Sequence, residues 1–271
     1  MRGEHSEPEP TLDIDTSVAH PARMYDYFLG GKDNFPADRE AAEKVLAIVP
    51  EGRDMARENR AFLGRAVRFL AGSGIRQFLD IGTGIPTQGN TNAVAHAVAH
   101  DARVAYVDND PIVLVHARAL LAAHDQDRTT VVQADLRQPA ELLAHPEVRA
   151  MIDFQQPVAI LLVAILHFIR DQEDPAGIVA CLKQVMAPGS YLVISHGTQD
   201  LDPVMAQRAV RPYNQATAPF ILRSRDEIAS FFDGLELVDP GLVQLPLWRP
   251  DGPVTANLDR IWLYGGIGQQ P

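Results

Sequence analysis

The stretch that decides the fold is FLDIGTGIPTQGN, residues 78–90. A short apolar run leads into Asp80, and two glycines, Gly82 and Gly84, follow with one residue between them. Glycine adopts backbone conformations that other residues avoid, and it lets another group approach the main chain closely. The pattern therefore predicts a strand that ends in a ligand-binding loop.

After Gly74, short apolar runs alternate with helical segments, and the first three runs end at Asp80, Asp108 and Asp135. Continuously apolar strands separated by helices are typical of a parallel sheet that is covered on both faces. Ligands of such sheets bind beyond the carboxyl ends of the strands. We therefore expect the three aspartates to lie at the same edge of a doubly wound α/β sheet.

The composition limits the kind of partner. The chain has 271 residues, of which 46% are hydrophobic, so it can bury the core of one large domain. Its net charge of −11 disfavours nucleic acid as a partner. A single cysteine excludes an intrachain disulfide, and the histidines show no metal-ligand spacing, so we expect no metal. Without a signal-peptide pattern or a membrane-length apolar run, we expect a cytoplasmic protein with no membrane partner.

Three regions of the chain differ in their composition and hydrophobic pattern. Residues 1–15 are polar and contain prolines, which predicts a disordered tail. Residues 16–74 follow helical patterns and predict a helical cap, and residues 75–271 carry the alternating core. Within the cap, ARMYDYFLGGKDNF predicts a lid in which Arg23 and Tyr27 close over the ligand. The alternative is a plain helix end followed by a solvated loop.

Two phosphate-binding readings of the glycine loop are weak. The dinucleotide fingerprint G-x-G-x-x-G requires a third glycine, and Thr87 stands there instead. Asp80 would also face the negative pyrophosphate. A P-loop fails because no Gly-Lys-Ser/Thr follows. An NAD(P)-dependent oxidoreductase remains a rival hypothesis.

S-adenosylmethionine suits the loop better because it carries no phosphate. Asp80 can face its ammonium group, and helix amides after Pro86 can favour its carboxylate. Asp108 is placed to meet the ribose hydroxyls. Asp135 can accept a hydrogen bond from the adenine amino group, although it can equally cap the next helix.

FLDIGTGIPTQGN, AYVDNDPIVLVHA and VVQADLRQP together resemble the motifs of class I S-adenosylmethionine-dependent methyltransferases. Pro86 departs from the usual D-x-G-x-G-x-G pattern. The flanking stretches HPARMYDYFLGGKDNFPADRE and RSRDEIASFFDGLELVDPGLV resemble an actinobacterial family named only as S-adenosyl methyltransferase. The resemblance covers roughly residues 15–266 and is specific for fold and cofactor.

The resemblance implies a Rossmann-like fold with a mostly parallel seven-stranded sheet, an antiparallel C-terminal strand and the helical cap. It implies S-adenosylmethionine as the cofactor and S-adenosylhomocysteine as the product. The cofactor residues that we expect are Asp80, Gly82, Thr83, Gly84, Asp108, Asn109, Asp135, Leu136 and Ala164, together with Arg23 and Tyr27 of the lid.

Methyl transfer is an in-line displacement, so the enzyme mainly positions the two reactants and excludes water. A general base is needed only when the acceptor must lose a proton. His167 and His196, which follow the fourth and fifth strands, are the candidates for such a base, although each can equally be a packed histidine. Tyr213 and Asn214 are candidate acceptor contacts, against the alternative of an ordinary loop.

We therefore expect a methyltransferase that acts on a small molecule. The alternative is a non-catalytic sensor of S-adenosylmethionine or S-adenosylhomocysteine. In a sensor, side chains from residues 210–220 would plug the space beside the methyl group.

Overall fold

The computed structural model describes residues 15–86, 89–121 and 127–271. The predicted tail, apart from Asp15, lies outside these residues. Within them, no helix is both long enough and apolar enough to cross a membrane.

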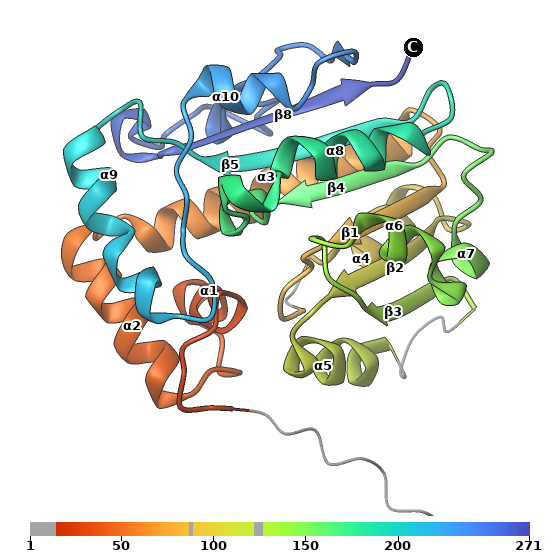
Figure 1. Ribbon diagram of the computed structural model, residues 1–271. Coiled ribbons are helices and arrows are strands. Elements are labelled where there is room, and N and C mark those ends of the chain that lie inside the picture. The colour runs from red at the N-terminus through yellow and green to blue at the C-terminus, as the bar shows by residue number, and fades with distance from the viewer. Residues whose placement is uncertain (1–14, 87–88, 122–126) are drawn as a thin grey trace, which may run out of the picture.

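One sheet organises the described chain (Figure 1). Its strands run in the order β3-β2-β1-β4-β5-β8-β6, and β7 pairs with β8 off this path. Strands β1 to β5 are parallel, and β8 is antiparallel to β5. The strands are β1 (Gln77–Ile81), β2 (Arg103–Asp108), β3 (Thr129–Gln133), β4 (Ala159–Val163), β5 (Tyr191–Gly197), β6 (Glu236–Leu237), β7 (Val243–Gln244) and β8 (Leu263–Gln269).

This arrangement confirms the Rossmann-like fold, with one strand more than the seven predicted. The extra strand arises because the stretch LELVDPGLVQL forms β6 and β7 rather than one strand. Pro240 and Gly241 interrupt it, and Gly241 has a positive φ of 85°. Proline cannot donate to a strand ladder, so the chain turns there and pairs with β8 twice.

Helices cover both faces of the sheet. On one face the side chains pack with α3 (Gly52–Gly72), α4 (Thr91–Val98) and α5 (Pro111–Leu121). On the other face they pack with α6 (Pro139–Ala144), α7 (Pro146–Met151), α8 (Pro175–Gln184) and α10 (Arg225–Ser230). A capping box begins α10: the backbone N–H of Ser224 donates to Glu227, and the Glu227 N–H donates to the Ser224 hydroxyl.

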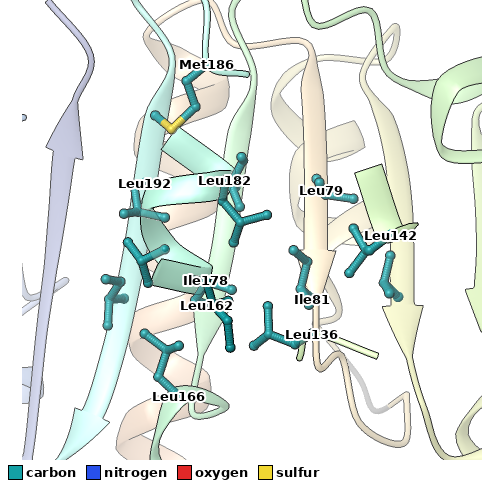
Figure 2. Packing of buried hydrophobic residues seen from close by; sticks show 14 of the residues in the cluster. Leu79, Ile81, Leu136, Leu142, Leu162, Leu166, Ile178, Leu182, Met186 and Leu192 are labelled. Atoms are coloured by element: carbon teal, nitrogen blue, oxygen red, sulfur yellow. The ribbon is translucent and has the colours of Figure 1, made fainter. Parts of the chain in front are cut away.

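The second of these packed layers is shown in Figure 2. Leu79, Leu162 and Leu192 of three neighbouring strands face Ile178 and Leu182 of α8, and all five side chains are buried. Full burial of such a side chain contributes roughly 1.5–3 kcal/mol. This layer holds the parallel strands in register and so fixes where their carboxyl ends lie.

A cap lies beyond the carboxyl ends of the central strands (Figure 1). It combines α1 (Pro21–Leu29) and α2 (Pro36–Ile48) with α9 (Pro203–Ala209) and the 3-10 helix η3 (Arg211–Gln215). Met24, Phe28 and Val45 share a hydrophobic cluster with Tyr213, which comes from the segment between β5 and α10. The cap is therefore built from two segments that are far apart in the sequence.

Candidate functional site

A cavity of about 530 Å³ lies between the strand ends and the cap. This volume is within the usual range for small-molecule sites. Its lining combines the loops after β1, β2, β3 and β4 with side chains of α1, α3 and the segment 209–222. The sheet edge predicted to bind the ligand is therefore one wall of this cavity.

The two glycines of the loop after β1 serve different needs. Gly82 and Gly84 both have positive φ angles, of 72° and 65°. A Cβ on Gly82 would lie 2.5 Å from the side chain of Ile165, whereas a Cβ on Gly84 would meet nothing within 4 Å. Gly82 thus makes room for protein packing, and Gly84 is the position where the loop borders open space.

Asp80 is buried at the end of β1 and accepts a hydrogen bond of 2.6 Å from the Thr91 hydroxyl. Burial raises the pKa of its carboxyl to about 6. Thr91 begins α4, which Asn90 caps, so this helix starts later than the sequence around Pro86 suggested. Asp80 therefore lies beside a helix start and lines the cavity.

Asp108, at the end of β2, holds the glycine loop in place. Its Oδ2 accepts from the Gly84 N–H at 2.9 Å, and its Oδ1 accepts from the Asp110 N–H at 3.0 Å. Burial raises the pKa of the Asp108 carboxyl. Each carboxylate oxygen still has capacity for a ligand donor. Asn109, which follows, is exposed and also lines the cavity.

Asp135 lines the cavity beyond β3 but is already paired. Arg137 donates to both of its oxygens, from Nε at 2.9 Å to Oδ1 and from a terminal nitrogen at 2.5 Å to Oδ2. Burial opposes ionisation of Asp135, but the contacts with Arg137 outweigh it and lower the carboxyl pKa. Leu136 is buried and lines the cavity beside this pair.

Ala164 follows β4 and connects the core to the cap through hydrogen bonds. It has a positive φ of 57°, and its N–H donates to the Ser195 hydroxyl at 2.9 Å. That hydroxyl donates to Oδ1 of Asn59 at 2.5 Å, and the Asn59 amide donates to the Tyr25 hydroxyl at 2.9 Å. The strand end is thus linked to α3 and α1.

Asn59 was not predicted as a site residue, although its sequence position carries a signal. Asn59 shares a helix face with Met55 and Phe62, and a polar residue in an apolar stripe marks a buried hydrogen bond.

The two predicted lid residues have partners inside the cap. Arg23 lines the cavity and is buried, but its Nε lies 3.2 Å from Asp38 and its guanidinium donates to the Val18 carbonyl. Tyr27 is not among the residues that line the cavity, and its hydroxyl donates to Glu43. Tyr25, two residues earlier, faces the cavity instead.

The two candidate histidines differ in position. His167 lines the cavity, and its Nδ1 accepts from the Gly197 N–H at 3.3 Å. Burial holds the pKa of His167 well below its usual value, so its ring is neutral.

His196 is not among the lining residues, which differs from its predicted place at the acceptor. Its Nδ1 lies 2.7 Å from the Gly197 carbonyl, and Arg223 donates to its Nε2 at 2.9 Å. Burial lowers the pKa of His196 to about 3. Both ring nitrogens are therefore used within the protein.

Of the two predicted acceptor contacts, Tyr213 lines the cavity and is 8% exposed. Asn214 lies next to it in η3, and its side chain is outside the part of the chain that the structure describes. This segment therefore reaches the cavity at Tyr213.

Arg60 of α3 was not predicted, but it matters for the charge of the site. It lines the cavity together with Asp80, and its positive charge opposes the rise in the pKa of that carboxyl. Its buried Nε has no hydrogen-bond partner within the described residues. An unpaired guanidinium donor beside a buried carboxyl suits a zwitterionic ligand that carries both a carboxylate and an ammonium group.

Comparisons with known proteins agree with this geometry. A family model described as S-adenosyl methyltransferase matches residues 7–271. A DUF574-family protein from Streptomyces avermitilis is 45% identical with a TM-score of 0.91, over 95% of this chain and 99% of that chain. A candidate methyltransferase from Thermobifida fusca is 43% identical with a TM-score of 0.90, over 97% and 99% of the two chains.

More distant structures share the fold alone. An O-methyltransferase family protein from Burkholderia thailandensis is 17% identical with a TM-score of 0.52, over 91% of this chain and 70% of that chain. None of the proteins with curated functions matches this chain.

Proposed function

Because this chain belongs to the S-adenosyl methyltransferase family, we propose that it transfers a methyl group from S-adenosylmethionine to a small molecule held beneath the cap. Membership confirms the family and the cofactor that the sequence motifs predicted. The observation that carries the acceptor proposal is the cavity itself, which continues from the aspartates at the strand ends to the apolar side chains of the cap.

The residues at the strand ends suit the cofactor. Asp80 faces its ammonium group, and the unpaired Nε of Arg60 suits its carboxylate. Asp108 holds the ribose hydroxyls with the lone pairs that Gly84 and the neighbouring backbone leave free. Asp135, fixed by its pair with an arginine, borders the adenine end.

The bound cofactor supplies a methyl group that its sulfonium already activates. The protein then has to align the acceptor and keep water out. His167 stays neutral and accepts from a backbone N–H, so we assign it to the wall of the site rather than to proton removal. We assign His196 a structural role, because its ring nitrogens are both engaged. The hydrogen bonds that join Ala164 to Ser195 and Ser195 to Asn59 fix the end of β4, beside which transfer takes place.

A small acceptor is favoured over a macromolecule. The net charge of −11 opposes nucleic acid, and apolar side chains of the cap line the part of the cavity away from the strand ends. A plug of that part by residues 210–220 would favour the sensor alternative. Tyr213 and Phe220 of this segment line open space rather than fill it, which favours an enzyme.

Calorimetric titration with S-adenosylmethionine and S-adenosylhomocysteine tests the cofactor site on the wild type and on Asp108→Ala. Binding of both ligands that is lost in the variant supports the assignment. Transfer from radiolabelled S-adenosylmethionine to any member of a small-molecule acceptor library separates an enzyme from a sensor. Failure of the wild type to bind either ligand would refute the proposal.

A further inference from the structure

We infer that the methyl acceptor is an uncharged, flat aromatic molecule with one polar group that hydrogen-bonds to Tyr213. This inference rests on the proposed function, because it names the substrate class of the same site.

The cavity divides by charge. The acids Asp80, Asp108 and Asp135 lie at the strand ends, and Arg60 lies beside the first of them. The other charged residues that line the cavity gather on this side too. Asp110 lies 3.0 Å from His20, Arg23 acts electrostatically on Asp110 and Asp15, and Arg137 pairs with Asp135. We call the remaining part the chamber; it is lined from Tyr25 and Phe28 of α1, from α2, from the residues of α3 other than Arg60, from the segment after β4 and from residues 209–222. Among the described residues, none of the side chains that line the chamber is an Asp, Glu, Lys or Arg. A charged acceptor would lose its hydration there with no opposite charge in return.

One side of the chamber is a wall of aromatic rings. It consists of His167, Phe168, Tyr213 and Phe220, all of which line the cavity. The ring centroids of His167 and Phe220 are 4.2 Å apart, those of Tyr213 and Phe220 are 5.0 Å apart, and those of Phe168 and Phe220 are 5.4 Å apart. Aromatic rings attract one another in offset-stacked and edge-to-face arrangements, so this wall favours an aromatic acceptor.

Polar groups in the chamber are few, and most are already paired. The Tyr25 hydroxyl donates to the Ala56 carbonyl and accepts from Asn59, whose Oδ1 accepts from Ser195. The Tyr213 hydroxyl makes no hydrogen bond to any residue that the structure describes, although Tyr213 is only 8% exposed. Burial also raises its pKa, so the hydroxyl keeps its proton. It is the group that can fix the orientation of an acceptor.

The test uses probes that differ only in the feature at issue. Full-length protein saturated with S-adenosylhomocysteine is titrated calorimetrically with 2-naphthol, naphthalene, 2-naphthoate and 2-naphthylmethylammonium. We expect 2-naphthol to bind saturably and both charged probes to bind at least tenfold more weakly. Tyr213→Phe should weaken the binding of 2-naphthol by about 2- to 12-fold, as expected for the loss of one neutral hydrogen bond. The affinity for naphthalene should stay unchanged. Phe220→Leu should weaken the binding of both uncharged probes, 2-naphthol and naphthalene.

Tyr264→Phe is the matched control, because Tyr264 lies on β8 and is not among the lining residues. It should bind every probe as the wild type does. Equal binding of charged and neutral probes, no binding of 2-naphthol, or no effect of Tyr213→Phe would overturn the inference while S-adenosylhomocysteine still binds. If S-adenosylhomocysteine itself fails to bind, the proposed function falls, and this inference falls with it.

Discussion

Acidification should weaken cofactor binding through Asp80. Burial raises the pKa of this carboxyl to about 6, so at pH 7.0 roughly nine in ten molecules carry the charge and at pH 5.0 roughly one in ten does. Only the ionised form can pair with the ligand ammonium. An apparent affinity falls in proportion to the competent fraction, so we expect the Kd for S-adenosylhomocysteine to rise about tenfold from pH 7.0 to pH 5.0.

The raised pKa of Asp80 has the opposite effect on the stability of the fold: acidification weakens cofactor binding but favours the folded state. The pKa of Asp80 is higher in the folded chain than its ordinary value of 3.8, so the folded state binds this proton more tightly. The group therefore stabilises the fold at low pH, and this contribution, about 3 kcal/mol at most, is lost as the pH rises through about 6. Weaker binding at pH 5.0 would thus not result from unfolding caused by Asp80.

Calorimetry at pH 5.0, 6.0 and 7.0 measures the effect, with thermal unfolding recorded in the same buffers. Asp80→Asn is the control, because its amide oxygen can still accept from the Thr91 hydroxyl but carries no charge. This variant should bind weakly at all three pH values, and its Kd should change much less than that of the wild type. Asp108 also has a raised pKa and accounts for any pH dependence that remains. A wild-type Kd that stays constant within twofold, or an equal pH dependence in Asp80→Asn, would refute the reasoning.

Three further predictions test the site and its supports. Asp108→Asn should weaken the binding of S-adenosylhomocysteine by about 10- to 150-fold, as expected for the loss of one charge-assisted hydrogen bond. The control Asp101→Asn, at an exposed position, should leave the calorimetric Kd unchanged. Gly82→Ala should lower the Tm because its Cβ would overlap a packed side chain at 2.5 Å, whereas Gly84→Ala should mainly reduce cofactor affinity; the reverse pattern would contradict the roles assigned to the two glycines. Arg223→Met should lower the free energy of unfolding in urea by at least about 2 kcal/mol, because two buried carbonyls lose their donor; a loss below 1 kcal/mol would exclude this role.

The sequence by itself determined the sheet and the place of its acids. Apolar runs that end at Asp80, Asp108 and Asp135 are a local pattern, and parallel strands bring their carboxyl ends to one edge whatever the other contacts are. All three side chains accordingly line the cavity. The motifs around them also predicted the cofactor through their resemblance to class I methyltransferases, and the flanking stretches predicted the family.

Only the tertiary structure decided which side chains face the acceptor. Tyr25 and Tyr27 are two residues apart on α1, where successive residues turn by 100°, so one lies at the cavity and the other contacts Glu43. His196 follows a strand as His167 does, but Arg223 from a distant segment engages its ring. Tyr213 joins the N-terminal helices only through packing between remote parts of the chain. A local pattern fixes what each segment is, but the contacts between distant segments fix what each side chain meets.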